Sequence, residues 1–358
     1  MSLSPRRAWL SLALSVLIVT PAYAQDAAKP DYPKLTELEA RFQRQEDDLA
    51  RSKLNALAEL ARSTQGDESE AAYRELFDLA VARGLLAEAE EAAREYLTHP
   101  RGPHESHALA ASVLLLARAG RGDYVQSLAD LEKFLRDKAA ASLPDERELP
   151  PGLAMSVGEA YLQTLIEAGR YDIARRVCEI GESLETDPSV RAHFKARKAR
   201  LAMVGTPAPA IEGKDIDGRP IRLADLKGKV VLVDFWATWC PPCVGSFATL
   251  RELSRKYRDK GLVILGVNLD SLSQPRPGAE IPKAEPAQAQ SDVRWFLVSQ
   301  RARWANLVGP GAEAAATAYG VAEIPARFLI DRDGKIVQVD QRVQALNKAV
   351  ARALGAKP

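Results

Sequence analysis

The chain has 358 residues, 46% of them hydrophobic, which is enough to build folded cores and excludes a chain that is disordered throughout. Its 49 Lys and Arg residues nearly equal its 48 Asp and Glu residues, and a formal net charge of +1 argues against a nucleic-acid-binding protein, which needs a basic surplus. Three cysteines are too few for a disulfide-stabilised scaffold of this length, and no apolar run beyond residue 24 is long enough to span a membrane.

Residues 1–24 have the three parts of a secretory signal peptide. Arg6 and Arg7 form the basic part, Ala8–Val19 the apolar part, and Pro21–Ala24 the small residues before a cleavage site. The alternative is an uncleaved N-terminal anchor, for which the apolar stretch is short. We therefore expect export to the periplasm or cell envelope of a bacterium and a soluble protein after cleavage.

Residues 25–203 are rich in Ala, Leu, Glu and Arg, and their apolar residues recur at helical spacing. Three segments each contain an apolar helix end, a glycine and a second Ala-rich helix. These glycines are Gly84, Gly120 and Gly169. The segments resemble degenerate tetratricopeptide-type hairpins, but an ordinary antiparallel bundle fits the irregular spacing equally well. Pro-rich breaks at 100–103 and 143–152 separate the helical pairs. The pattern predicts an all-helical domain over 25–203.

A basic run, Arg191–Arg200, closes this helical region. It could form a patch for an anionic partner. A solvated face of the last helix, with positive charge near its C-terminus, is the favoured interpretation.

From residue 204 the pattern changes to mixed strands and helices, which predicts an α/β domain over 204–358. A turn is predicted at Asp215–Gly218, with strands at Val230–Phe235, Leu262–Leu269, Ala326–Ile330 and Ile336–Val339 and helices at Pro242–Tyr257, Ser291–Arg303 and Gln341–Leu354. The Pro-, Ala- and Gln-rich segment Asp270–Ser291 lacks periodicity and is either a flexible insert or a substrate-facing loop.

A Cys-Pro-Pro-Cys motif stands where the first predicted strand passes into a helix. Two cysteines at this spacing are within disulfide reach. Cys240 begins the helix, where unpaired N–H groups and the helix dipole favour its thiolate, so it is the predicted attacking sulfur. Cys243 lies one turn deeper and can resolve a mixed disulfide. Pro241 and Pro242 suit the first turn of a helix and stiffen the short ring.

A zinc site and a purely structural disulfide are the alternatives to a redox pair at this motif. A zinc site needs two further ligands, and the remaining Cys178 and four scattered histidines do not repeat the spacing, so no metal is expected. A purely structural disulfide stays open as the minor alternative. Cys178 itself stands in an apolar-periodic helix and is predicted to be a buried small residue rather than a third redox thiol.

The segment Asp234–Cys243, the opening Val204–Pro209 and the pair Ile324-Pro325 together resemble the thioredoxin-like superfamily, in particular the envelope branch related to TlpA and ResA. The resemblance covers residues 204–358. It implies a central mixed sheet flanked by helices, thiol–disulfide exchange with envelope proteins, no bound cofactor, and electrons from a membrane-embedded donor. Isoleucine before the proline resembles the reducing members, which implies a reductase.

The resemblance also implies roles for single residues. Pro325 would be the cis-proline that lies opposite the disulfide and shapes the substrate groove. Asp234 takes the position of a buried aspartate that accepts a proton from the second cysteine, although a polar strand-end residue is the plain alternative. Trp239 would pack near the disulfide on the docking surface, whereas Trp236 fits the core equally well. Ser246 stands where ResA-like proteins usually have a glutamate, which puts a role in cytochrome maturation in doubt.

Two further functions remain as alternatives. The opening of the α/β domain is shared with peroxiredoxin-like proteins, so a thiol peroxidase is possible in principle, but the usual sequence context of its reactive cysteine is absent around Cys240. The other alternative is an interaction protein whose helical hairpins bind a protein partner while the thioredoxin-like domain is a scaffold. The intact Cys-Pro-Pro-Cys motif argues against that alternative.

Overall fold

The structure is a computed structural model that describes residues 33–98, 104–140, 153–184, 187–271 and 286–357. The predicted signal peptide and the two Pro-rich breaks lie outside the described residues. The chain divides into two compact units, 1–49 and 50–358, which are described separately. In the first unit the described residues form the N-terminal part of helix α1 (Pro33–Ser63). None of the helices within the described ranges combines the length and the apolar character needed to cross a membrane.

Helices make up the described chain as far as residue 202, as the periodicity predicted. After α1 they are α2 (Asp67–Arg83), α3 (Leu86–Tyr96), α4 (His104–Gly120), α5 (Tyr124–Ala140), α6 (Leu153–Glu167), α7 (Tyr171–Leu184) and α8 (Pro188–Ala202). Two of the predicted turn glycines, Gly84 and Gly169, have positive φ angles of 70° and 72°. At the third turn Gly122 has this conformation, with φ 89°, and Gly120 is the last residue of α4. The resemblance to tetratricopeptide hairpins stays a prediction.

Small residues let the last three helices approach one another closely. Gly158 on α6 and Gly181 on α7 both face the buried ring of Phe194 on α8, and a Cβ atom at either glycine would overlap that ring. Interiors are packed too densely to accept such an overlap without movement. The two glycines therefore leave room for the Phe194 ring and allow α8 to pack closely on α6 and α7. Helix α8 is the helix next to the α/β region in the sequence.

The second part of the chain is a mixed sheet with flanking helices. The strands are β1 (Glu212–Asp215), β2 (Pro220–Arg222), β3 (Val230–Trp236), β4 (Leu262–Asn268), β5 (Ala305–Val308), β6 (Ala326–Ile330) and β7 (Ile336–Val339). They are arranged in the order β2-β1-β5-β4-β3-β6-β7. The helices are α9 (Pro241–Tyr257), α10 (Pro286–Ser299), α11 (Pro310–Ala318) and α12 (Leu346–Leu354), with short 3₁₀ turns η1 (Leu223–Leu226), η2 (Arg258–Lys260) and η3 (Val343–Ala345). Strands β3, β4 and β5 are parallel, while β6 runs antiparallel to β3. This is the mixed sheet that the resemblance implied.

Some predicted boundaries were wrong. Helix α10 begins at Pro286 and ends at Ser299, so the predicted helix Ser291–Arg303 is shifted, and the insert predicted over Asp270–Ser291 is helical at its end. The closing helix begins at Leu346 rather than Gln341. Strand β5 and helix α11 were not predicted, because β5 has four residues and lacks a clear alternation and α11 is a short Ala-rich helix.

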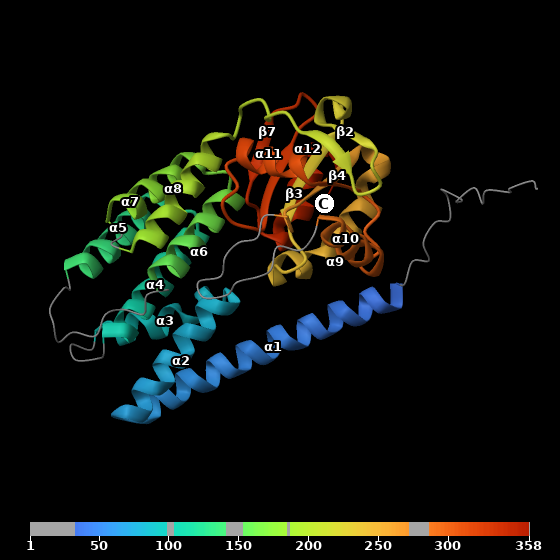
Figure 1. Cartoon of the computed structure of the whole chain (residues 1–358). Helices are drawn as coiled ribbons and strands as arrows, with labels where there is room; N and C mark the ends of the chain where they lie inside the picture. Colours follow the sequence, from blue (N-terminus) through green and yellow to red (C-terminus); the bar gives the residue numbers. More distant parts are fainter. Residues whose placement is uncertain (1–32, 99–103, 141–152, 185–186, 272–285, 358) are drawn as a thin grey trace, which may run out of the picture. The chain divides into compact units, whose positions relative to one another are not determined.

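Both faces of strand β3 are buried, which explains its continuous apolar sequence. Val231, Val233 and Phe235 join one core together with α11, α6, α7 and α8. Val230 and Leu232 face the opposite way and pack with α9 and α12. Figure 1 shows the strands of this sheet together with helices α9 to α12. The first of these cores continues from the helical region into the sheet. The strand is thereby held from both sides at the point where it leads into α9.

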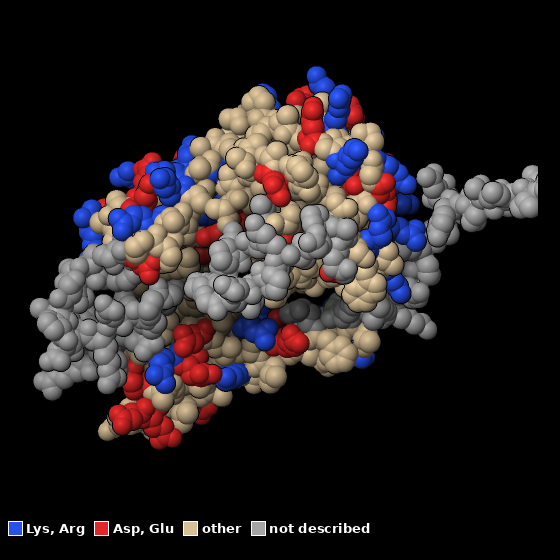
Figure 2. Space-filling model, in the orientation of Figure 1, with Lys and Arg blue, Asp and Glu red and all other residues tan. Residues whose placement is uncertain are grey.

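Charged side chains of both signs are mixed on the face shown in Figure 2. On the face shown in Figure 2, Lys and Arg lie among Asp and Glu over the described residues of the larger unit. This distribution fits the near equality of 49 basic and 48 acidic residues in the sequence.

Candidate functional site

Cys240 and Cys243 form a disulfide at the start of α9, with Cα atoms 5.3 Å apart. Cys240 is the N-cap residue, and its Sγ accepts a hydrogen bond from the backbone N–H of Cys243 at 3.3 Å. Pro241 and Pro242 occupy the first turn of α9, where a backbone N–H has no acceptor within the helix, so proline is tolerated there. The Cys243 N–H and the positive end of the α9 dipole therefore face the Cys240 sulfur and favour its anionic form in the reduced pair.

The two cysteines differ slightly in the exposure of the whole residue. Cys240 is 4% exposed and Cys243 is fully buried. Both pack in an apolar cluster with Phe247 of α9 and with Val293 and Leu297 of α10. Both cysteines are therefore buried in this cluster, and only Cys240 has any exposed surface.

The two tryptophans that flank the motif have different environments. Trp239 is 42% exposed beside Cys240, which is the position predicted for a docking residue. Trp236 is fully buried, and its Nε1–H donates to Asn306 Oδ1 at 3.0 Å. Trp236 is therefore a core residue at the end of β3.

The loop between β3 and Cys240 is fixed by Asp270, a residue that was predicted only as the start of an insert. One carboxylate oxygen of Asp270 accepts the Thr238 N–H at 2.7 Å, and the other accepts the Thr238 hydroxyl at 2.9 Å. Burial raises the pKa of this carboxyl group. Because β3 and β4 are parallel, their carboxyl ends share one edge of the sheet, and this relation could have predicted the contact.

The Ile324–Pro325 peptide bond is cis, as the resemblance implied. Both residues are half-buried. The Ile324 side chain packs against the apolar cluster that contains Cys240 and Cys243. The segment before β6 is thereby placed beside the disulfide.

A chain of buried polar contacts connects Asp234 to the backbone of Cys243. Asp234 on β3 is paired in register with Arg327 on β6, and Arg327 Nε lies 2.8 Å from Asp234 Oδ1. The Arg327 Nη2–H donates to Ser246 Oγ at 2.8 Å, and the Ser246 hydroxyl donates to the Cys243 carbonyl oxygen at 2.6 Å. Burial raises the pKa of Asp234, while the Arg327 charge opposes that rise. Asp234 thus lies in the buried position that the resemblance predicted.

Arg327 was missed in the sequence. A single arginine between Ala326 and Phe328 in an otherwise apolar strand was the available signal, because a buried strand accepts a cation only with a partner. Ser246, at the position where a glutamate was expected from the resemblance, is that cation's second contact.

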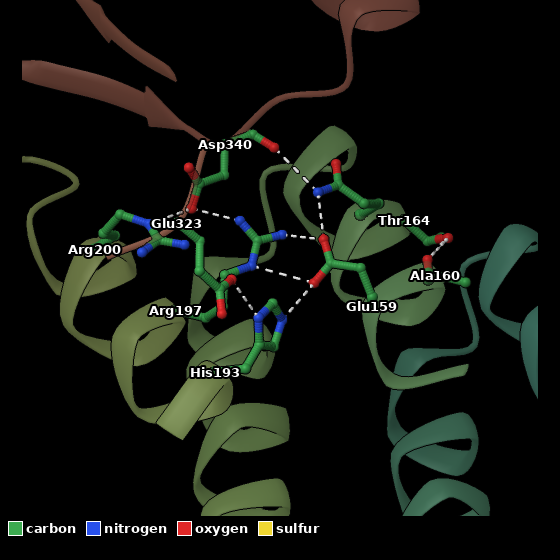
Figure 3. A network of polar contacts seen from close by, with 9 residues as sticks. Glu159, Ala160, Thr164, His193, Arg197, Arg200, Glu323 and Asp340 are labelled. Atoms are coloured by element: carbon green, nitrogen blue, oxygen red, sulfur yellow. Dashed lines mark hydrogen bonds and ion pairs between the residues drawn. The ribbon is translucent and has the colours of Figure 1, made fainter. Parts of the chain in front are cut away.

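A second polar network joins the helical region to the segment near Pro325 (Figure 3). The His193 ring of α8 lies between two carboxylates, with Nδ1 2.7 Å from Glu323 Oε2 and Nε2 3.2 Å from Glu159 Oε2. Arg197, one turn further along α8, forms ion pairs with Glu159 and with Asp340. The last helix of the helical region therefore holds the chain two residues before the cis-proline.

The expectation of a solvated basic run at Arg191–Arg200 was wrong for two of its arginines. Arg197 and Arg200 are 5% and 3% exposed. Arg200 Nε donates to Asp340 Oδ2 at 2.7 Å, so the two guanidinium groups share one buried carboxylate. Residues at this spacing share one helix face, and here that face meets the α/β region rather than solvent.

Cys178 is fully buried, as predicted, and is not part of a disulfide. Burial raises the pKa of its thiol to about 12, so the thiolate form is suppressed at neutral pH. Within the described residues, no group of three or more His, Cys, Asp or Glu side chains is arranged to hold a metal ion.

Known proteins resemble the α/β part of the chain. The model of the AhpC/TSA family matches residues 204–339. Thiol-disulfide oxidoreductase ResA of Bacillus thuringiensis (strain Al Hakam) is 32% identical over 145 residues, which are 40% of this chain and 73% of the relative. ResA of Geobacillus thermodenitrificans (strain NG80-2) is 31% identical over 151 residues, 42% of this chain and 76% of the relative. The chain belongs to the family of ResA-like thiol–disulfide oxidoreductases. Among solved structures, the thioredoxin domain of a thiol-disulfide oxidoreductase from Bacteroides vulgatus is 27% identical, with a TM-score of 0.35, over 42% of this chain and 97% of that one.

A ResA-like thiol–disulfide oxidoreductase needs two sulfurs that alternate between disulfide and dithiol. Among the described residues, Cys240 and Cys243 at the start of α9 are joined by a disulfide, and Cys178 is free and buried. Cys240 caps α9, Cys243 is fully buried, and Ile324, which precedes the cis-proline, packs against their cluster.

Proposed function

We propose that the protein is an exported reductase that transfers electrons from Cys240 and Cys243 to disulfides of other envelope proteins. The observation that carries the proposal is the difference between the sulfurs. Cys240 caps α9 and keeps some exposure, and Cys243 is enclosed. The sequence pattern at residues 1–24 supports export, and the isoleucine before Pro325 supports the reducing direction.

The proposed reaction has two exchange steps. The Cys240 thiolate attacks a substrate disulfide, forms a mixed disulfide and releases the first substrate sulfur as a thiolate that takes up a proton. Cys243 then gives its proton to the Asp234 carboxylate, and its thiolate attacks the Cys240 sulfur. The bond between Cys240 and the substrate breaks, and the second substrate thiolate leaves. Two electrons pass from the protein dithiol to the substrate disulfide.

The surroundings supply a binding surface for the substrate. Pro325 and the exposed Trp239 would form the two sides of a groove for an extended peptide segment. We further propose that a membrane-embedded donor re-reduces the pair, and that the helical domain over 25–203 binds a protein partner while residues 204–358 carry the chemistry.

Reduction of insulin disulfides in a dithiothreitol-coupled assay tests the proposal. The mature protein and its Cys178→Ala variant are expected to accelerate reduction equally, and Cys240→Ser is expected to be inactive. Cys243→Ser is expected to accumulate a mixed disulfide with the substrate, because the resolving sulfur is missing. Equal activity of wild type and Cys240→Ser would contradict the proposal.

Two further measurements separate the alternatives. Consumption of hydrogen peroxide by the reduced protein, well above a Cys240→Ser control, would support a peroxidase instead. Full complementation of a deletion strain by the double variant Cys240→Ser, Cys243→Ser would support a scaffold whose function lies in the helical domain.

A further inference from the structure

Arg327 is a cation in the interior of the sheet. It stands two residues after Pro325 on β6, and 7% of its side chain is exposed. A buried guanidinium loses its hydration, and a hydrophobic residue of similar size would meet no such penalty in an apolar strand. The contacts of Arg327 therefore call for an explanation beyond packing.

Those contacts connect the buried acid to the redox pair. Arg327 Nε lies 2.8 Å from Asp234 Oδ1, and Arg327 Nη2 lies 2.8 Å from Ser246 Oγ. Ser246 in turn binds the carbonyl oxygen of Cys243 at 2.6 Å. One side chain thus contacts the predicted proton acceptor and the residue that anchors the first turn of α9.

The two oxygens of Asp234 are in different situations. Within the described residues neither oxygen accepts a hydrogen bond, but Oδ1 forms the ion pair with Arg327 Nε at 2.8 Å. A carboxylate that is buried without a cation would be neutral at pH 7, because desolvation disfavours its charged form. The guanidinium offsets that effect and leaves Oδ2 as the oxygen able to take a proton.

We propose that Arg327 is a positioning residue that favours the ionised form of Asp234, with Oδ2 outside the ion pair, for transfer of the Cys243 proton in the resolving step. Arg327 takes this role only if Cys240 and Cys243 exchange disulfides as proposed above. In the step itself the Cys243 S–H bond breaks and an O–H bond forms on Asp234. The Cys243 sulfur then bonds to Cys240, and the thiolate of the bound substrate leaves with the bonding electron pair.

Single-turnover oxidation of the reduced protein by glutathione disulfide tests this role. The Cys178→Ala background is used, and the mixed disulfide on Cys240 is counted by mass spectrometry after acid quenching, from pH 5 to pH 9. Asp234→Asn is expected to slow the resolving step by about 100-fold, since a general base commonly contributes about that factor or more. Arg327→Met is expected to slow it by about 10-fold at pH 7 and to move the midpoint of the pH profile upward by about one unit.

Three comparisons separate positioning from a general structural effect. Adding Arg327→Met to Asp234→Asn is expected to cause no further slowing, because Arg327 acts through Asp234. Arg327→Lys keeps the charge and is expected to retain the wild-type pH midpoint, which preserves the test if Arg327→Met does not fold. Arg251→Met is the control: Arg251 is also a cation on α9, but it donates to the Gln300 carbonyl oxygen and does not contact Asp234. This variant is expected to leave the rate of the resolving step unchanged.

Additive effects of Arg327→Met and Asp234→Asn, or an unchanged pH midpoint in Arg327→Met, would overturn the assignment of Arg327 while leaving the proposed function intact. A wild-type protein that forms no mixed disulfide with glutathione at Cys240 would overturn both.

Discussion

Arg200 on α8 and Asp340, which follows β7, form an ion pair with a 2.7 Å contact in which each side chain is 3% exposed. Arg197 binds the same carboxylate, and the Asp340 backbone N–H donates to the Arg327 carbonyl oxygen at 2.7 Å. Asp340 thereby joins the helical region to strand β6. The side chain of Arg327 on this strand contacts Asp234. The helical region is built into the surroundings of the disulfide rather than attached through a linker alone.

Removing the Asp340 charge is expected to destabilise the protein strongly. Asp340→Asn leaves two buried guanidinium groups without their shared carboxylate, and breaking a buried ion pair in this way costs about 3 to 5 kcal/mol. Asparagine tolerates the positive φ of 50° at this position, so the effect of charge is isolated from backbone strain. Urea unfolding of the wild type and the variant measures the difference.

The matched control is Asp259→Asn, which removes a carboxylate that is 86% exposed and pairs with Arg258. A change within about 0.5 kcal/mol is expected there. Similar losses in both variants would show that the Asp340 network is not a special source of stability.

His193 is expected to make stability depend on pH in the alkaline range. Burial by itself lowers the pKa of His193, but its hydrogen bonds and charge interactions with Glu159 and Glu323 raise it to about 9. A histidine whose folded pKa is raised stabilises the fold fully below its unfolded pKa, about 6.5, and loses that contribution as the pH rises through about 9. The full contribution is at most about 3 kcal/mol.

The measurement is the free energy of unfolding from pH 5.5 to pH 9.5 for the wild type and His193→Gln. The difference between the two proteins is expected to be constant below about pH 6.5 and to shrink toward pH 9. Glu159 stays ionised over this range because, although burial opposes it, the His193 hydrogen bond and the Arg197 charge lower its pKa to about 2. A difference that does not change with pH would rule out a charged His193 between the two carboxylates.

Two glycines near the site are expected to respond to alanine in opposite ways. A Cβ on Gly266 of β4 would overlap Asn306 Oδ1, the acceptor of the Trp236 hydrogen bond, and overpacking of this kind costs about 1 to 3 kcal/mol. Gly245 on α9 is exposed with nothing within 4 Å of an added Cβ, so Gly245→Ala is expected to stabilise the helix by up to about 1 kcal/mol. Thermal unfolding of both variants compares them, and equal shifts would refute the packing argument.

Cysteine alkylation is expected to separate the three thiols of the reduced protein. Cys240 should react with iodoacetamide first, because it caps α9 and retains exposure. Cys178 should react only in denaturant, since it is fully buried and its thiol pKa is raised to about 12. Mass spectrometry of timed samples gives the order, and rapid labelling of Cys178 in the folded protein would contradict its burial.

Local patterns predicted the parts of the fold that are determined by nearby residues. The apolar run of β3, the strands β6 and β7 and the position of Cys240 at a helix start all follow from short segments. Contacts between residues far apart in the sequence could not be predicted in this way. Nothing near Arg197 in the sequence indicates that Asp340 will face it, and only the pairing of β3 with β6 places Arg327 opposite Asp234.

The same distinction explains the error at the basic run. A helix of alternating charged and apolar residues is typically solvated on its charged side. Here the arginines at 197 and 200 meet carboxylates from distant segments, Glu159 on α6 and Asp340 after β7. Tertiary contacts of this kind leave no mark in a local pattern.

The reduction potential of the Cys240–Cys243 pair tests the central claim most directly. The Cys178→Ala protein is equilibrated against defined ratios of reduced and oxidised dithiothreitol and glutathione, and the dithiol fraction is counted by alkylation. A reversible two-electron transition near or below about −230 mV is predicted, as expected for a thioredoxin-like reductase, whereas a potential above about −150 mV would indicate an oxidant. A pair that shows no reversible two-electron transition would contradict the assignment of Cys240 and Cys243 as the redox site.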